Sequence, residues 1–252
     1  QEPAISATQQ SIWVNPSRVT APLAAAGALA PVLGEDIPTL QERLTRSGSF
    51  VYLARKVDDS IAEKVKELAL PGVAFVPESK RMLPAGELAT PVLGSVGLDN
   101  EGLSGLERQF ETRLAGRPGR LVVEKDPGGR EIAGGQRDYQ PSTRGEDLVL
   151  TIDRALQYEA ERALAAEIVK AKAKGGTAIA METATGEILA LANLRASEDD
   201  TGPPVLPAIR NRAATDIFEP GSVNKLITIA GALEEGIVKP ETTLTVASTI
   251  QV

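Results

Sequence analysis

The chain contains neither histidine nor cysteine among its 252 residues. It therefore cannot build a Ser-His-Asp triad, a Cys-His pair or the usual zinc site from its own side chains. If the protein is a covalent catalyst, serine with lysine is the main arrangement left. Paired carboxylates remain open as an alternative, although no acidic pair stands out from the solvated charges. We expect no metal and no cofactor.

Runs of basic residues and long apolar runs are also lacking. The net charge is −7, and we therefore expect no nucleic-acid partner. No segment reaches the 18 consecutive apolar residues of a membrane-spanning helix, because prolines interrupt the best candidate at residues 21–33. Aromatic residues make up only 3% of the chain, which predicts a core of Ala, Leu, Val and Ile.

The first part of the chain alternates short strands with helices, which indicates an α+β fold. A turn-rich link at 80–86 and two glycine-dense stretches follow, and the glycines predict close approach of backbone segments. We place a domain boundary in the polar stretch 134–144. The predicted strands are 11–16, 50–54 and 73–76, the helices are 22–33, 39–46, 60–70 and 106–114, and a hairpin joins 121–124 to 131–133.

After the boundary, residues 148–152 form a continuous apolar run, which predicts a buried strand. Asp153 is placed to cap the next helix. Strands at 177–181 and 187–192 follow, and then a polar, proline-containing loop at 193–209. The predicted apolar stripe of the helix consists of Leu156, Ala160, Ala163, Leu164 and Ile168.

A sharp turn at Pro220-Gly221 precedes a helix that starts at Ser222 and stops at Gly236. This helix is apolar nearly all round, which predicts burial on most sides. Ser222 and Lys225 lie three residues apart and so share one face of its first turn. A buried lysine amine tends to lose its proton, and it can then act as general base for a serine hydroxyl. The alternative is an ordinary buried helix with a serine cap and a lysine that reaches water.

Several segments, taken in this order and spacing, resemble the class B penicillin-binding proteins, the monofunctional D,D-transpeptidases of bacterial cell-wall synthesis. The segment at residues 51–56 resembles the septal, cell-division branch more than the elongation branch. The matching segments are Lys80-Arg81-x-x-Pro84-x-Gly86, Gly102-Leu103-x-Gly105-Leu106-Glu107, Asp147 to Asp153 with Leu156-Gln157 and Glu161, Thr185 to Ala190, Asn211-Arg212-Ala213 and Glu219-Pro220-Gly221-Ser222-x-x-Lys225.

The resemblance implies a serine acyl-enzyme. Ser222 would attack the D-Ala-D-Ala carbonyl of a peptidoglycan stem peptide, and Lys225 would take the serine proton. The backbone N–H of Ser222 would supply half of the oxyanion hole. β-Lactams would mimic the donor peptide and trap Ser222.

The resemblance also implies two domains. Residues 1–146 correspond to a non-catalytic pedestal of the dimerisation type, and residues 147–252 correspond to the first part of a transpeptidase domain. The implied partners are stem peptides and their lipid-linked precursor, a membrane glycosyltransferase and other cell-division proteins. The implied location is the extracytoplasmic face of the bacterial membrane, with an N-terminal anchoring helix that is not present in this chain.

Two further motifs of the family, Ser-x-Asn and Lys-Thr/Ser-Gly, are not found among the 27 residues that follow Lys225. We therefore expect this chain to be a piece of a longer enzyme and to be inactive alone. Two other interpretations stay open. One is an interaction module of the division machinery without chemistry, and the other is a related β-lactam-binding serine acylase or sensor.

Overall fold

The structure is a computed structural model, which describes residues 2–124, 132, 134–199 and 201–245. It consists of helices and antiparallel sheets, which confirms the predicted α+β class. The chain divides into two compact units, residues 1–214 and 215–252.

The first sheet has the strand order β2-β1-β3, with β1 at Ile5–Val14, β2 at Val51–Val57 and β3 at Val73–Met82. β1 pairs with β3 over its whole length, from Ile5 opposite Met82 to Val14 opposite Val73. The predicted strands 11–16 and 73–76 were therefore too short, and residues 80–82 of the predicted link belong to β3. The added residues are mostly polar, so a search for apolar runs does not detect them.

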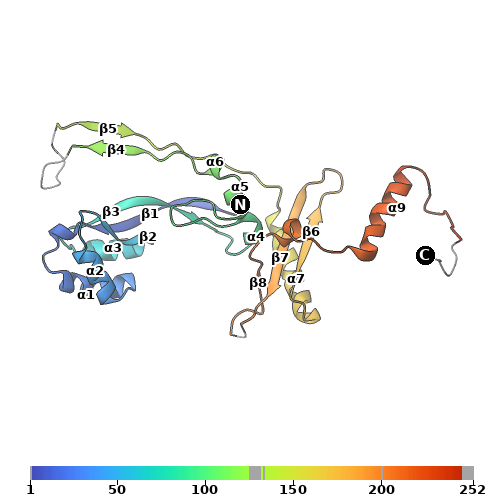
Figure 1. Cartoon of the computed structure of the whole chain (residues 1–252), viewed down its shortest axis with the longest axis horizontal. Helices are drawn as coiled ribbons and strands as arrows, with labels where there is room; N and C mark the ends of the chain where they lie inside the picture. The colour runs from blue at the N-terminus through green and yellow to red at the C-terminus, as the bar shows by residue number, and fades with distance from the viewer. Residues whose placement is uncertain (1, 125–131, 133, 200, 246–252) are drawn as a thin grey trace. The chain divides into compact units, whose positions relative to one another are not determined.

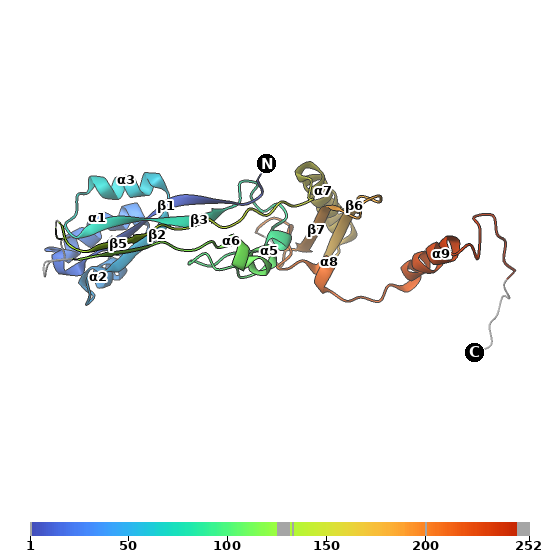
Figure 2. The same cartoon turned by 90° about the horizontal axis from the view of Figure 1, so that it is seen from above.

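Three helices cover one face of this sheet, as Figures 1 and 2 show: α1 at Pro22–Leu33, α2 at Ile37–Thr45 and α3 at Asp59–Glu67. Between them lies a core whose fully buried members are all aliphatic, as predicted from the composition. Each such side chain contributes roughly 1.5–3 kcal/mol to folding. The largest are Ile12, Leu29, Leu40, Leu44 and Leu53.

The glycine-dense region folds into three short helices, α4 at Thr90–Leu93, α5 at Gly105–Gln109 and α6 at Glu111–Leu114. A Cβ atom on Gly94 would lie 1.9 Å from the carbonyl oxygen of Ser104, which confirms the predicted close backbone approach. The predicted single helix 106–114 is wrong in one respect, because Phe110 leaves helical geometry and separates α5 from α6.

A two-stranded hairpin follows, with β4 at Arg120–Val123 paired to β5 at Arg137–Gln140. The hairpin was predicted, but its second strand was not. Two of the three residues expected there, 131 and 133, lie outside the described residues. The strand that pairs with β4 is a polar segment of the predicted boundary region, and its exposure on both faces explains why no apolar alternation marks it.

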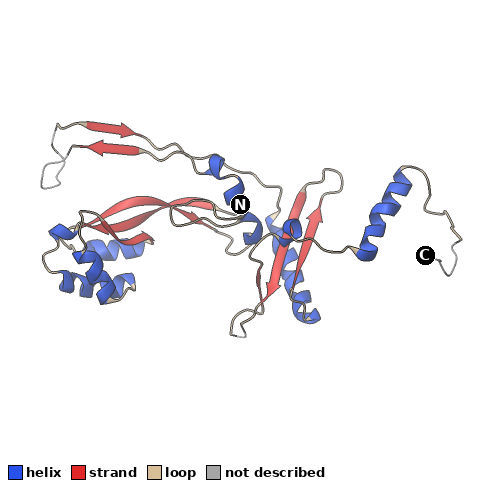
Figure 3. Ribbon diagram, in the orientation of Figure 1, coloured by secondary structure: helices blue, strands red, loops and turns tan. Residues whose placement is uncertain are grey.

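The second sheet has the order β6-β7-β8, with β6 at Gly175–Met181, β7 at Ile188–Ala196 and β8 at Val205–Pro207. Helix α7, Arg154–Ala171, packs along this sheet (Figure 3). The oxygen of Asp153 accepts a hydrogen bond from the N–H of Leu156 at 2.8 Å, which confirms the predicted cap. Part of the predicted loop 193–209 is strand, because β7 extends to Ala196 and β8 forms an edge.

Residues 148–152 do not form the predicted buried strand. Val149 is 92% exposed, while Leu148, Leu150 and Ile152 are half-buried. This extended segment touches the start of β7, where the Thr151 hydroxyl donates to the carbonyl of Ile188 at 2.7 Å. Only one side of the segment packs, and a continuous apolar run does not reveal that.

Candidate active site

The second unit carries the predicted serine and lysine. Ser222 lies in a 3-10 turn, η2 at Gly221–Asn224, and Lys225 is the first residue of α9, Lys225–Glu234. Gly221 has a φ of +52°, a left-handed conformation that suits glycine and produces the sharp turn. Helix α9 therefore starts three residues later than predicted. Ser222 and Lys225 still lie three residues apart in the continuous helical segment that η2 and α9 form. Gly236, with a φ of +68°, follows the end of α9 as expected.

The predicted burial of this helix is wrong for the described residues. Leu226 is 69% exposed and Ile227 is 74% exposed, and Ser222 and Lys225 are exposed as well. The described part of this unit, residues 215–245, contains no second long element that packs on α9. Within that part, no hydrogen bond joins the Ser222 hydroxyl to the Lys225 amine. The apolar sequence of α9 nevertheless marks a surface that is suited to packing.

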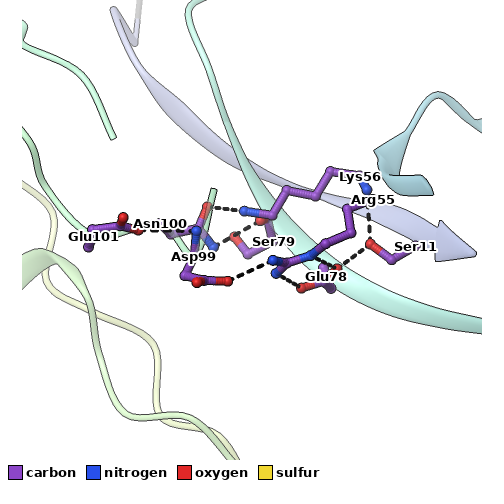
Figure 4. A network of polar contacts seen from close by, with 8 residues as sticks. All are labelled: Ser11, Arg55, Lys56, Glu78, Ser79, Asp99, Asn100 and Glu101. Atoms are coloured by element: carbon purple, nitrogen blue, oxygen red, sulfur yellow. Dashed lines mark hydrogen bonds and ion pairs between the residues drawn. The ribbon is translucent and has the colours of Figure 1, made fainter. Parts of the chain in front are cut away.

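A second polar cluster lies in the first unit at a β-bulge between β1 and β2. Gln10 pairs with Val57 and Ile12 pairs with Ala54, so that Ser11 opposes two residues. One of these two, Lys56, has a φ of +51°, an uncommon conformation for a residue with a side chain. Figure 4 shows the side chains that gather at this bulge.

Glu78 on β3 lies at the centre of the cluster. Its carboxylate accepts hydrogen bonds from the Nε and Nη2 atoms of Arg55, at 3.0 and 2.5 Å, and from the hydroxyl of the buried Ser11. The bonds from Arg55 hold the pKa of Glu78 below its ordinary value, although burial acts in the opposite direction. The same guanidinium also pairs with Asp99 at 2.8 Å.

Lys56 extends the cluster to the loop at residues 99–101. Its Nζ donates to Asn100 Oδ1 at 2.7 Å, and the Asn100 amide donates to the carbonyl of Ser79 at 2.9 Å (Figure 4). Burial lowers the pKa of Lys56. The bonds from Lys56 and Asn100, together with the ion pair between Arg55 and Asp99, fasten this loop to the sheet.

Sequence reasoning assigned no role to two buried amides, those of Gln157 on α7 and Asn193 on β7. The predicted apolar stripe of α7 placed Leu156 and Ala163 inward, but both are exposed, and Gln157 and Ile168 are the buried residues of this helix. The signal in the sequence for the burial of Gln157 was its helical spacing from Leu164 and Ile168.

The described residues contain no group of three or more acidic side chains that could hold a metal ion. None of the helices in the same residues is both long and apolar enough to cross a membrane.

Comparison with known families agrees with this architecture. The model of the penicillin-binding protein dimerisation domain matches residues 4–150, and the model of the penicillin-binding protein transpeptidase domain matches residues 176–252. The chain belongs to the penicillin-binding proteins. Its relatives place it in class B, as the sequence motifs predicted.

The peptidoglycan D,D-transpeptidase FtsI of Escherichia coli K12 is 35% identical over 250 residues, which cover 96% of this chain and 42% of that protein. A probable peptidoglycan D,D-transpeptidase, PenA of Neisseria gonorrhoeae, is 35% identical over 239 residues, 92% of this chain and 41% of that protein. The chain thus spans less than half the length of these curated relatives.

A solved structure of a peptidoglycan synthetase from Bifidobacterium adolescentis is 29% identical and has a TM-score of 0.62, covering 99% of this chain and 50% of that one. The penicillin-binding protein PBP2 of Helicobacter pylori, solved in complex with MreC, has a TM-score of 0.66 at 18% identity and covers 100% and 53% of the two chains. The likeness to the Helicobacter pylori protein shows the fold alone.

The boundary between the two domains, placed between residues 146 and 147, stays a prediction.

Proposed function

We propose that this chain is part of a peptidoglycan D,D-transpeptidase of septal cell-wall synthesis, in which Ser222 is the nucleophile and Lys225 is its general base. The observation that carries the proposal is the Ser222 turn directly before α9, inside the segment that matches the transpeptidase model. The septal assignment rests on the resemblance of residues 51–56 to that branch of the family.

The proposed reaction has two steps. In the first, Lys225 accepts the proton of the Ser222 hydroxyl, and the serine oxygen bonds to the carbonyl carbon of the penultimate D-Ala. The bond to the terminal D-Ala breaks, and its nitrogen leaves with a proton. In the second, an amine of a neighbouring stem peptide attacks the ester, forms the cross-link and releases Ser222. Free N–H groups at the helix start suit the oxyanion that develops in each step.

The wider setting is proposed on the same basis. The substrates would be stem peptides and their lipid-linked precursor, on the extracytoplasmic face of the bacterial membrane. The partners would be a membrane glycosyltransferase and other division proteins, and β-lactams would acylate Ser222 in place of the donor peptide.

The test uses the full-length protein that contains these residues, incubated with a fluorescent penicillin and then digested for peptide mapping. We expect one adduct, on the peptide that contains Ser222. Ser222→Ala abolishes it, while Ser60→Ala, an exposed serine at the start of α3, leaves it unchanged. An adduct that persists on Ser222→Ala would contradict the assignment. If the wild-type protein itself stays unlabelled, the interaction-module interpretation is favoured instead.

The role of Lys225 is tested by the rate of the same reaction. Removing a general base typically slows a reaction by about 10²–10⁴-fold, so Lys225→Ala should slow acylation by at least about 100-fold. Lys239→Ala is the matched control, because this lysine is exposed in the same unit. Near-normal acylation of Lys225→Ala would remove its role as base.

A further inference from the structure

The side chain of Gln157 joins α7 to the middle strand of the second sheet. It is fully buried, its Oε1 accepts from the N–H of Leu191 at 2.7 Å, and its Nε2 donates to the carbonyl of Leu191 at 3.2 Å. The amide thus makes to β7 the pair of bonds that a neighbouring strand would make. A helix attached in this way cannot shift along the strand without leaving a buried backbone group unpaired.

Asn193, two residues further along β7, holds the segment that leads toward the proposed nucleophile. This side chain is 1% exposed. Its Oδ1 accepts from the N–H of Ala213 at 2.8 Å, and its Nδ2 donates to Asn211 Oδ1 at 3.1 Å. Ala213 precedes Ser222 by nine residues, so these bonds hold the end of the first unit, from which the chain continues toward Ser222.

Glu161, one turn along α7 from Gln157, ties the same network to the N-terminal region. One carboxylate oxygen, Oε1, accepts both from Gln157 Nε2 at 2.7 Å and from the N–H of Ala89 at 2.9 Å. Ala89 has a φ of +56° and directly precedes α4, within the part that matches the dimerisation-domain model. Ala89, which is buried and has a strained backbone conformation, is thus held by a hydrogen bond to the carboxylate of Glu161.

These bonds connect three segments that are far apart in sequence. The carbonyl of Leu191 lies within hydrogen-bond distance of both amides, at 3.2 Å from Gln157 and 3.4 Å from Asn193. Buried polar networks in which every member has a partner hold one geometry strongly, because any shift leaves a polar group without a bond. The network therefore links the backbone before α4 to the segment that precedes the Ser222 turn.

We propose that Glu161, Gln157 and Asn193 form a relay of positioning residues, through which the N-terminal region sets the rate at which the transpeptidase part is acylated. The proposal rests on the function proposed above. None of the three touches the reacting atoms. They act by fixing where the chain leaves the second sheet on its way to Ser222.

The experiment measures, in the full-length protein, the acylation rate constant at saturating penicillin and the dissociation constant of the complex before acylation. Asn193→Ala removes both bonds to the 211–213 segment. We expect the rate constant to fall at least about tenfold, equivalent to about 1.4 kcal/mol of barrier, while the dissociation constant stays within about twofold. Asn193→Asp keeps an acceptor for the N–H of Ala213 and should restore most of the rate.

A second pair of variants tests the other end of the relay and remains informative if Asn193→Ala does not fold. Glu161→Ala removes the acceptor for the N–H of Ala89 and should lower the rate constant severalfold, while Glu161→Gln keeps that acceptor and should resemble the wild type. Glu167→Ala is the matched control, because this glutamate of α7 is exposed and forms an ion pair with Lys170 at 3.2 Å.

Each outcome decides the proposal. Loss of rate in the alanine variants with recovery in the conservative variants supports the relay. Rates within about twofold of wild type in both alanine variants overturn it, and so do losses that the conservative variants fail to recover. Absence of any Ser222 adduct on the wild-type protein overturns the proposed function itself, which is a different result from wild-type acylation with unaffected variants.

Discussion

The cluster around Glu78 allows a stability prediction that can be made in detail. Glu78→Gln keeps the shape of the side chain but removes its charge. The carboxylate makes two hydrogen bonds to Arg55 and one to Ser11, and its side chain is 18% exposed. A hydrogen bond to a charged group contributes about 1.5–3 kcal/mol, and partial exposure lowers that value. We therefore expect the free energy of unfolding of this region to fall by about 2 kcal/mol.

The assay is thermal or urea unfolding followed by tryptophan fluorescence. The single tryptophan, Trp13, lies on β1 and stacks on Phe50 with ring centroids 4.7 Å apart, so its emission reports on the sheet that contains Glu78. A loss of about 2 kcal/mol corresponds to a decrease in Tm of roughly 8 °C for a region of this size. Glu63→Gln is the control, because Glu63 is 64% exposed and its ion pair with Lys66 should contribute less than about 0.5 kcal/mol.

The pH dependence gives a second check. Because the bonds from Arg55 lower the pKa of Glu78 in the folded protein, the contribution of Glu78 is fully present above the pKa of an unfolded glutamate, about 4.3. It is lost as the pH falls through the lower pKa of the folded state. The difference in stability between wild type and Glu78→Gln should therefore be largest near pH 6–7 and shrink below about pH 4. Equal stabilities at pH 7, or a difference that persists in acid, would refute this account.

Two further substitutions test the backbone. Gly94→Ala should destabilise the protein by more than about 2 kcal/mol in urea unfolding, because the φ of Gly94 is +88° and the new Cβ would lie 1.9 Å from the Ser104 carbonyl oxygen. The control is Gly27→Ala in α1, whose new Cβ meets open space and which should stabilise the protein by roughly 0.5–1 kcal/mol. Asp153→Ala should cost about 1 kcal/mol by removing the acceptor for the Leu156 N–H, and Asp153→Ser should recover most of this; equal stability of the two variants would contradict the capping role.

The elements that the sequence predicted well are those in which local chemistry and tertiary packing agree. Helix α1 begins at a proline and ends before a glycine with a φ of +69°, as predicted to within a residue. The Asp153 cap and the close approach at Gly94 follow from the same kind of local rule. Such features depend on a few neighbouring residues, and the sequence contains them all.

The elements that sequence reasoning missed depend on partners far along the chain. Residues 5–10 and 77–82 are strand because each pairs with the other, although neither segment shows an apolar pattern. Gln157 occupies a core position because the backbone of a strand residue 34 positions away, Leu191, bonds to both the oxygen and the nitrogen of its side-chain amide. A polar residue in an amphipathic helix is normally assigned to the solvent face, so its helical spacing from Leu164 and Ile168 was not enough to place it inward.

The candidate site likewise has some features that the sequence predicts and others that depend on distant packing. The identity and spacing of Ser222 and Lys225 could be predicted from a short sequence motif, and the structure places both in one continuous helical turn. The burial that the proposed chemistry needs was predicted from the apolar sequence of α9, but it depends on what packs over α9 rather than on α9 itself. In the described residues the flanking Leu226 and Ile227 are mostly exposed.

This exposure has a consequence for the mechanism. Excluding water from a site strengthens the electrostatic interactions inside it. Covering the apolar side chains of α9 would exclude water from the helical turn that contains Ser222 and Lys225. The proposed reaction therefore requires a state in which this surface is covered. Assembly of the apolar environment of α9, and not the presence of Ser222 and Lys225 alone, would then control when the serine becomes reactive.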